Sequence, residues 1–536
     1  MIFNSLNQPY PKSRYSVSAP NGMVSTTSPL ASSVGIEIMK KGGNAVDAAV
    51  AMAAMLTVVE PCSNGVGSDA FAIVWMKNKI YGINGSGVTP KDISIDKVKK
   101  LGYEEMPKRG WIPIMVPGAP ATWAELIERF GNLSLSEVLE PAAKYAEEGF
   151  TVGPVLSFLF NKYITRDYDF YKNKREHEEF LKVFTDNGKP YKMGDKVIFP
   201  DLAKTLRSIG ETNARSFYEG ELCDKIILQS KRDGGFFRKE DFANYKVEWV
   251  DPISVNYRGY DIWELPPNGQ GIVTLIALNI LKNFNFKDRE NLEEIHKQME
   301  AIKIAFAEAL TTVTDPKEMK IDYHKYLDET YGLRKAATIT DKASKQKPVD
   351  PNASGTVYLC TADKEGNMVS YIQSNYMEFG SGVVIEGTGI SLQNRGFEFK
   401  LDKNYVNALE PNKKTYHTII PGFITKDNKA IGPFGVMGGY MQPQGHVQVL
   451  MNMLDFGLDP QAALDAPRWQ WIKDMKFKFE PEYRNDVIKA LIEKGHDIQV
   501  QENCFSFGRG QIIIRLDNGT LLGGCESRAD SCIACY

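Results

Sequence analysis

Apolar residues follow a helical period in the first half of the chain and a strand period near its end. The stretch from Ser28 to Val59 predicts two helices separated by Gly42 and Gly43, and the second is apolar on nearly every side, so it should be buried. Residues 292 to 313 predict one long helix, whereas Ser354 to Asp363 alternates like a buried strand. Helices mixed with strands from both halves favour a layered α/β sandwich.

The turns and connectors between these segments refine the predicted order of helices and strands. Residues 71 to 85 read as a hairpin that turns at a Lys-Asn-Lys centre, and residues 116 to 131 read as a turn followed by an amphipathic helix that Gly131 ends. Lys317 to Ala353 is polar, rich in lysine and poor in strand pattern. This segment is predicted to be an exposed connector, and it leads directly to Gly355 and Thr356 at the head of a strand.

Bulk composition excludes several classes of function. The 536 residues are 43% hydrophobic and 24% charged, which is typical of a globular protein, and 64 basic residues balance 67 acidic ones to a formal charge of -3. No lysine- or arginine-rich block suits a nucleic-acid partner. Neither a signal-peptide pattern nor an uninterrupted apolar run of about eighteen residues is seen, so we expect a cytoplasmic protein with no membrane partner.

Cysteine and loop motifs give no sign of a metal or cofactor. Cys525, Cys532 and Cys535 crowd the end of the chain, but a second ligand pair at zinc spacing is missing nearby, so free thiols are expected. The stretch "PPNGQG" lacks the Lys-Ser/Thr ending of a phosphate loop. The six histidines are dispersed, with His446 expected to start a helix and His296 to lie within one. No metal and no cofactor are predicted.

The pair Gly355-Thr356 allows a specific chemistry. If the chain is cut before Thr356, the freed α-amine becomes a general base for the hydroxyl of the same residue. Gly355 suits such a cut because a distorted peptide there has no Cβ to clash. Gly438 and Gly439 could supply backbone N–H donors for the oxyanion. By themselves these residues also fit a plain turn before a strand and a bulge or tight bend.

A resemblance decides between these interpretations. Several motifs occur in the order seen in the γ-glutamyltranspeptidase family, and the match covers almost the whole chain. The chain is similar to the cytoplasmic, signal-less glutathione hydrolase-like proenzymes of that family. The motifs are "PLASSVGIEIMKKGGNAVDAAVAMAAMLTVVEPCSNGVG", "VPGAPATWAEL", "PPNGQGIVTL", "GTVYLCTADKEGN", "GSGVVIEGTGISLQN", "VMGGYMQPQGHVQVLMNMLDFGLDPQAALDAPRW" and "ESRAD".

The resemblance implies an N-terminal nucleophile hydrolase with a four-layer αββα fold. An inactive precursor would cleave itself before Thr356, and a large subunit of residues 1–355 would stay associated with a small subunit of residues 356–536. Thr356 would then attack a γ-glutamyl amide and form an acyl-enzyme that water or an acceptor amine resolves. The resemblance places Ser374 as a hydroxyl supporting Thr356, and Gly438 and Gly439 as the oxyanion glycines. A homo-oligomer is compatible with it.

Departures from the family pattern concern the substrate. Ser86 stands where the family has a carboxylate-binding Arg, and His417-Thr418 replaces its Ser-Ser pair; Thr418 keeps a hydroxyl donor and His417 could add another. Arg395 replaces a neutral or acidic residue that faces the substrate amine. Glu398 stands for the family's amine-binding Asp, and Tyr376 for an Asn beside the pocket.

These departures leave alternatives open for three side chains. Arg395 could hold a substrate carboxylate from a new direction, or it could form an ion pair at the surface or a subunit interface with Glu398 or Glu386. Glu398 is correspondingly a substrate ligand or the salt partner of Arg395. Tyr376 is a packed aromatic or a ligand, with packing favoured.

Three functional hypotheses follow. The leading one is a self-processing γ-glutamyl transferase and glutathione hydrolase-like enzyme that uses Thr356 on a small-molecule amide. The second is an acylase for glutaryl-type or β-lactam side-chain amides, suggested by Ser86 and Arg395. The third is an unprocessed, catalytically silent binder of amino-acid derivatives, against which the retained Gly355, Thr356 and Ser374 argue.

Overall fold

Two seven-stranded sheets stacked face to face form the centre of the computed structural model, which describes residues 14–346, 355–502 and 504–536. The first sheet has the order β1 (Val17–Ala19), β20 (Leu521–Cys525), β19 (Arg509–Arg515), β15 (Lys429–Met437), β14 (Gly422–Lys426), β9 (Tyr260–Glu264) and β8 (Ile253–Tyr257). The second has the order β21 (Cys532–Cys535), β2 (Met23–Thr26), β10 (Gly355–Ala362), β11 (Met368–Tyr376), β3 (Asp69–Met76), β4 (Lys79–Gly85) and β7 (Glu248–Val250).

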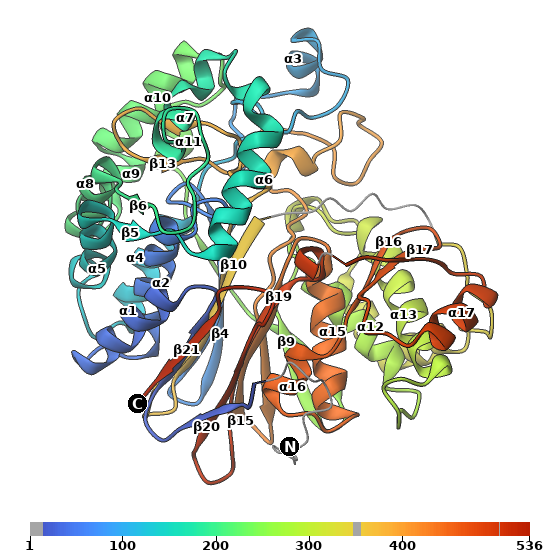
Figure 1. The fold of residues 1–536 in the computed structure, drawn as a ribbon. Coiled ribbons are helices and arrows are strands. Elements are labelled where there is room, and N and C mark those ends of the chain that lie inside the picture. Colours follow the sequence, from blue (N-terminus) through green and yellow to red (C-terminus); the bar gives the residue numbers. More distant parts are fainter. Residues whose placement is uncertain (1–13, 347–354, 503) are drawn as a thin grey trace.

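Helices cover the outer face of each sheet (Figure 1). The second sheet is covered by α1 (Pro29–Lys40), α2 (Ala45–Val59) and α4 (Ala119–Phe130), while α5 (Leu135–Glu148) packs on α2 and α8 (Pro200–Glu211) packs on α5. The first is covered by α12 (Gly271–Leu281), α15 (Met441–Leu454) and α16 (Pro460–Asp465), while α13 (Leu292–Leu310) packs on α12 and α17 (Asn485–Glu493) packs on α13. The further helices on the side of the second sheet include α3 (Ile95–Lys100), α6 (Pro154–Tyr171), α7 (Glu178–Phe184), α9 (Arg215–Tyr218), α10 (Glu221–Arg232) and α11 (Lys239–Ala243).

Three separate apolar cores match this order of layers. One lies between the second sheet and its helices, and another lies between the first sheet and its helices. The third contains residues from both sheets, such as Phe71 and Tyr358 from one and Phe423 and Ile513 from the other. A core on each side of each sheet is what a four-layer sandwich requires. The predicted αββα fold is therefore confirmed.

Local predictions are confirmed where the pattern is strong. The helices α1 and α2 flank the predicted Gly42-Gly43 break, β3 and β4 form the predicted hairpin, and Gly131 ends α4. All fifteen residues of α2 are buried, because this helix lies between the second sheet and α5. No described helix meets the length and hydrophobicity that a membrane span demands.

The predicted connector from Lys317 to Ala353 is wrong in its middle. Helix α14 (Glu329–Ala336) lies there, preceded by 3-10 turns, and it packs on α12. Its contact is close, because a Cβ at Gly332 would come 2.3 Å from the carbonyl oxygen of Asn279. Helix α14 was not predicted because most of its residues are polar and only Tyr331, Gly332 and Ala336 are buried. Residues 347–353 of the predicted connector, and Ser354 after it, lie outside the described residues.

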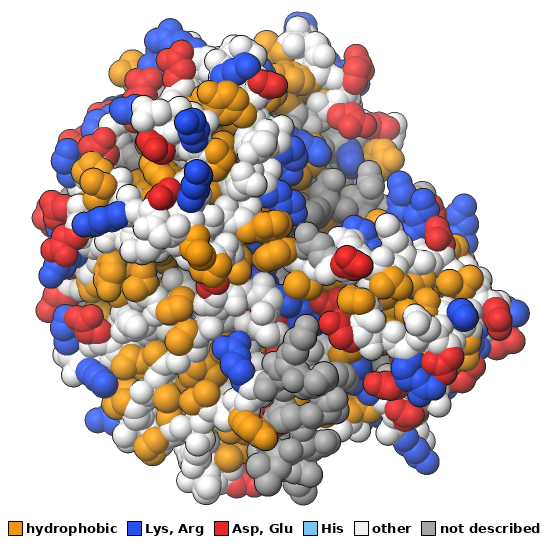
Figure 2. All heavy atoms as spheres, in the orientation of Figure 1, with side chains coloured by type: hydrophobic (Ala, Val, Ile, Leu, Met, Phe, Trp, Pro, Cys, Tyr) orange, Lys and Arg blue, Asp and Glu red, His pale blue; other side chains and the backbone are white. Residues whose placement is uncertain are grey.

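The visible surface mixes charges of both signs. Figure 2 shows lysine and arginine side chains interspersed with aspartate and glutamate over the face that it displays. Many of these charges form ion pairs, such as Arg207 with Glu140 and Glu147. Exposed pairs of this kind contribute little to stability. The stability of the fold therefore depends mainly on its apolar cores.

The capping box of α2 gives a test of this architecture. Asn44 accepts from the backbone N–H of Val46 and Asp47, its own N–H donates to Asp47, and its amide donates to the carbonyl oxygen of Phe130 on α4. We expect Asn44→Ala to lower the free energy of unfolding by about 1 to 2 kcal/mol. Asn291→Ala, which removes the exposed N-cap of α13, should cost less. Denaturant midpoints measure both variants, and equal losses would contradict the role given to Asn44.

Candidate active site

A bulge places Thr356 in the middle of the second sheet. Gly355 pairs with Tyr376 and Val357 pairs with Gln373, so Thr356 alone faces two residues of β11. Such a bulge interrupts the ladder and re-aims a side chain. Thr356 is fully buried, and β10 lies between β2 and β11 in the sheet.

The hydroxyl of Ser374 links three groups at this bulge. Its Oγ lies 3.0 Å from Thr356 Oγ1, donates to the carbonyl oxygen of Gly355 at 2.8 Å, and accepts from the backbone N–H of Tyr376 at 2.8 Å. A serine hydroxyl has one proton. Because that proton is directed at Gly355, the Thr356 hydroxyl must be the donor in its contact with Ser374. This contact joins Ser374 to Thr356, the residue whose hydroxyl it is predicted to support.

Arg395 is buried, contrary to its interpretation as a surface ion pair. Its side chain is 1% exposed, its Nε lies 3.4 Å from Asp69 Oδ2, and its Nη1 donates to Thr418 Oγ1 at 2.7 Å. Its Cζ lies 4.2 Å from the centre of the Tyr376 ring. Nη2 has no hydrogen-bond partner among the described residues. A buried guanidinium with one free donor is suited to a planar anion.

The two carboxylates proposed as partners of Arg395 have other hydrogen-bond or ion-pair partners. Glu386 pairs with Arg232 near the surface. Glu398 accepts hydrogen bonds from the hydroxyls of Tyr376 and Tyr440, so it is not the salt partner expected for Arg395. Burial raises the pKa of Glu398, while the two tyrosine hydroxyls and Arg395 act in the opposite direction.

Tyr376 is packed inside the site, as the favoured interpretation expects. The side chain is fully buried and stacks on Arg395, and its hydroxyl donates to Glu398. Its backbone has a φ of 72°, a left-handed conformation that is unusual outside glycine. The residue therefore connects the bulge at Thr356 to the charged part of the site.

The donor nitrogen of His417 is used in a hydrogen bond to Asp69 and is not directed at a substrate position. Its Nε2 lies 2.9 Å from Asp69 Oδ2, and its Nδ1 accepts from the backbone N–H of Ile419 at 3.4 Å. Burial and the nearby Arg395 lower the pKa of His417 to about 4, so the ring is neutral at pH 7. Thr418 presents its hydroxyl to Arg395 instead.

Ser86 lies in a neighbouring network of amides. Its hydroxyl donates to Asn84 Oδ1 at 2.7 Å and accepts from Asn268 Nδ2 at 3.2 Å. The next residue, Gly87, directs its N–H toward Asp69 Oδ1 at 3.4 Å. Ser86 thus stands beside the Asp69 and Arg395 pair, with its hydroxyl engaged by other side chains.

Gly438 and Gly439 form the bend between β15 and α15. Their φ angles of 142° and 57° are in the range that favours glycine. The carbonyl oxygen of Gly439 accepts from Gln270 Nε2 at 2.8 Å, and the same amide donates to the carbonyl oxygen of Thr418 at 2.5 Å. The bend therefore lies against the Arg395 side of the site, at the N-terminus of α15, where backbone N–H groups favour an anion.

Three residues of this network were not predicted. Asp69 opens β3 after a glycine-rich turn, Gln270 belongs to the stretch considered as a phosphate loop, and Tyr440 follows the glycine pair. For Tyr440, its position directly after Gly439 in the sequence could have indicated that it lies in the site. Beside them, Glu398, Tyr416 and Tyr440 line a cavity of about 210 Å³.

Possible metal ligands lie away from this site. His296 Nδ1 and His496 Nε2 approach to 2.9 Å with Glu300 beside them, although the two histidines are 200 residues apart in the sequence. Lys303 Nζ lies 2.5 Å from Glu300 Oε1 and already neutralises the carboxylate. His446 lies inside α15 and contacts Glu264, although it was expected at the start of the helix. The seven cysteines are free thiols.

Comparison with known proteins agrees with this geometry. The family model described as Gamma-glutamyltranspeptidase matches residues 31–536. The glutathione hydrolase-like YwrD proenzyme of Bacillus subtilis (strain 168) is 36% identical over 96% of this chain and 98% of its own length. The acylase ACY 1 proenzyme of Pseudomonas sp. (strain SE83) is 30% identical over 96% of this chain and 93% of its own length.

A solved structure supports the same conclusion over the full fold. The crystal structure of cephalosporin acylase from Bacillus halodurans superposes with a TM-score of 0.95 at 50% identity, covering 100% of this chain and 99% of that one. The predicted resemblance is thereby confirmed: the chain belongs to the γ-glutamyltranspeptidase family, whose members are amidohydrolases and acyltransferases.

Proposed function

We propose that this protein is a self-processing γ-glutamyl amidohydrolase and transferase whose nucleophile is Thr356. The observation that carries the proposal is the Ser374 hydroxyl, which contacts both Thr356 Oγ1 and the carbonyl oxygen of Gly355. A donor on that oxygen polarises the carbonyl that Thr356 must attack. Attack forms an ester between Gly355 and Thr356 Oγ1, and the peptide nitrogen takes up the hydroxyl proton and becomes the free α-amine of Thr356. Water then hydrolyses the ester to give the carboxylate of Gly355 and the free hydroxyl of Thr356.

The two segments would remain joined after this cut. Residues 356–536 contribute β10 and β11 to the second sheet, where β2 and β3 from residues 1–355 pair with them on either side. Both sheets contain strands from both segments. Separation would expose two strand edges and divide all three cores, which is strongly unfavourable. We therefore propose a large subunit of residues 1–355 and a small subunit of residues 356–536.

A γ-glutamyl donor, such as glutathione, fits the charges around Thr356. Its α-carboxylate matches the free Nη2 of Arg395 and the hydroxyl of Thr418, and its α-amine matches Glu398. The bend at Gly438 and Gly439 is the proposed oxyanion site. The cytoplasmic location also belongs to this proposal, because a reducing compartment keeps the seven cysteines as thiols.

One observation favours a second candidate, an acylase for glutaryl-type amides. Glu398 already accepts from two tyrosine hydroxyls, and its burial raises its pKa. Both features make it a weaker partner for an ammonium group, whereas a glutaryl chain keeps the carboxylate and lacks the amine. The 50% identical structure is titled a cephalosporin acylase, which supports the same candidate.

Matched anilides separate the two candidates. We expect turnover of a γ-glutamyl anilide with a kcat/KM at least tenfold above that of the glutaryl anilide, because only the first offers an amine to Glu398. Release of the aniline is measured by absorbance, with Thr356→Ala as the control that forms no acyl-enzyme. Preference for the glutaryl compound would assign the acylase function instead.

Arg395 should affect substrate binding more than processing. We expect Arg395→Ala to raise the donor KM at least tenfold while the rate of self-cleavage falls by less, since Nη2 faces the substrate carboxylate and the Ser374 contacts do not involve it. Arg395→Lys keeps the charge but loses the planar fork, so it should rescue KM only in part. Equal losses in KM and self-cleavage would make Arg395 a structural residue.

A further inference from the structure

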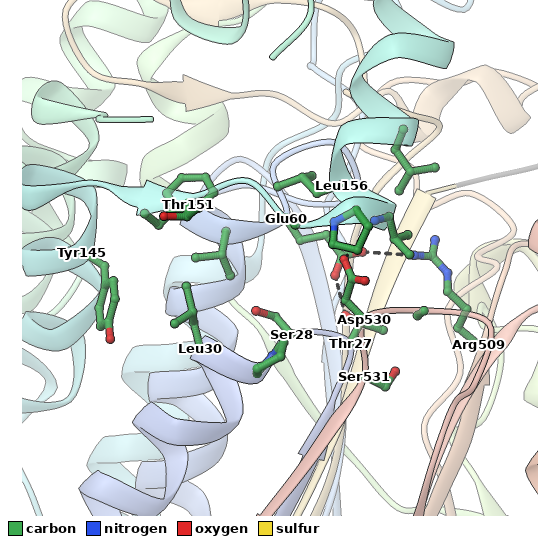
Figure 3. A pocket seen from close by; sticks show the side chains of 18 of the residues that line it. Thr27, Ser28, Leu30, Glu60, Tyr145, Thr151, Leu156, Arg509, Asp530 and Ser531 are labelled. Atoms are coloured by element: carbon green, nitrogen blue, oxygen red, sulfur yellow. Dashed lines mark hydrogen bonds and ion pairs between the residues drawn. The ribbon is translucent and has the colours of Figure 1, made fainter. Parts of the chain in front are cut away.

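The buried side chain of Gln270 contacts two parts of the proposed site at once. Gln270 stands directly before α12, in the stretch "PPNGQG", and is fully buried. It lines neither the cavity of about 610 Å³ at the starts of α1 and α6 (Figure 3) nor the cavity beside Glu398. A substitution of Gln270 therefore acts through the groups that its amide contacts.

Both protons of the Gln270 amide are used. Nε2 donates to the carbonyl oxygen of Thr418 at 2.5 Å and to the carbonyl oxygen of Gly439 at 2.8 Å. The Thr418 hydroxyl accepts from Arg395, and Gly439 belongs to the proposed oxyanion bend. One side-chain nitrogen thus ties the segment that carries a proposed carboxylate ligand to the bend that carries the proposed oxyanion donors.

The oxygen of the same amide holds a third group. Oε1 accepts from the hydroxyl of Tyr416 at 3.1 Å, and the Tyr416 ring stacks on Tyr440 with 5.8 Å between the ring centres. The Tyr440 hydroxyl in turn donates to Glu398. Because the two carbonyl oxygens on Nε2 can only accept, a single orientation of the amide satisfies all three contacts.

The backbone around Gln270 fixes this amide in place. The N–H of Gln270 donates to the carbonyl oxygen of His417 at 2.9 Å, and the N–H of His417 donates to the carbonyl oxygen of Asn268 at 2.9 Å. Gly269 and His417 form an isolated parallel bridge between the two segments. The amide is therefore held beside Thr418 by its own main chain.

The bend at Gly438 and Gly439 requires such a support. Both residues have positive φ angles, and two successive glycines have no Cβ that restricts their backbone. Backbone donors stabilise an oxyanion only when they are already in position as the charge develops. A hydrogen bond from a buried amide to the Gly439 carbonyl oxygen restricts the peptide that follows Gly439.

We propose that Gln270 is a positioning residue that couples recognition of the substrate carboxylate to the geometry of the oxyanion site. The inference rests on the proposed acyl transfer at Thr356. A carboxylate bound by Arg395 and the Thr418 hydroxyl restricts Thr418, so the amide that spans Thr418 and Gly439 is restricted as well. Substrates that carry this carboxylate then gain in kcat and not only in KM.

Anilides with and without the carboxylate test the coupling. In the wild-type protein we expect kcat for the γ-glutamyl anilide to exceed that for the 4-aminobutyryl anilide, which lacks only the carboxylate, at least tenfold. Gln270→Met keeps the length of the side chain and removes both donors, so the two kcat values should come within about threefold while the KM ratio persists. Glutaryl and butyryl anilides form the same comparison if the protein prefers acyl groups without an amine.

Two further variants control for a loss of stability. Gln229→Met removes another buried amide, which donates to the carbonyl oxygen of Val384 and accepts from the N–H of Glu386, so it should lower the melting temperature and leave the kcat ratio unchanged. Gln270→Glu keeps the size of the side chain and an acceptor for Tyr416 but loses the amide donors, so it should lose the kcat ratio as Gln270→Met does.

Hydrogen exchange of residues 437–442, which contain the bend, separates this inference from the proposed function. Exchange that slows on adding glutarate to the wild-type protein but not to Gln270→Met supports the coupling even if every anilide is inert, and the proposed function then fails alone. Inert anilides without a glutarate effect would overturn both. Equal kcat values for the paired anilides in the wild-type protein, or a kcat ratio that survives in both Gln270 variants, would overturn the coupling while hydrolysis at Thr356 stands.

Discussion

The hydroxyl of Ser374 is the contact on which the rest of the site depends. It has one proton to donate and two lone pairs to accept with, and the bulge gives it a carbonyl, a backbone N–H and the Thr356 hydroxyl as neighbours. All three positions follow from the register of β10 against β11. A one-residue slip of either strand would turn Thr356 or Ser374 to the other face of the sheet. The stacked sheets and their cores thus hold one serine hydroxyl in place.

Charge in the site is arranged around the buried cation of Arg395. Arg395 is opposed by Asp69, which also accepts from a neutral His417, and the Tyr376 ring covers its guanidinium. A buried cation without an anion is very costly, so Asp69 is required for Arg395 to be present. Asp69 also engages His417, and among the described residues Nη2 of Arg395 has no hydrogen-bond partner.

Much of the fold was predictable because its signals are local. The break at Gly42-Gly43, the β3 and β4 hairpin and the strand that opens at Gly355 all follow from short-range pattern and turn chemistry. Helix α14 was missed because few of its residues are buried, and the surface that covers them comes from α12, about fifty residues earlier.

The site was predictable only in part, for the same reason. The resemblance supplied Thr356, Ser374, Gly438 and Gly439 as proposed catalytic residues. The burial of Arg395 depends on Asp69, which is 326 residues away, and the contact between His296 and His496 spans 200 residues. No periodicity reports such pairings, because they arise only when distant segments of the chain pack together.

Intact mass measurement of the purified protein tests the central claim most directly. Self-cleavage predicts two fragments that divide between Gly355 and Thr356, with Thr356 at the amino terminus of the smaller one, and a single uncut chain for Thr356→Ala. Ser374→Ala, which removes the donor to the Gly355 carbonyl, should slow the cut by roughly a hundredfold or more. One intact chain after prolonged incubation of the wild-type protein, or a cut at any other peptide bond, would contradict the role assigned to Thr356.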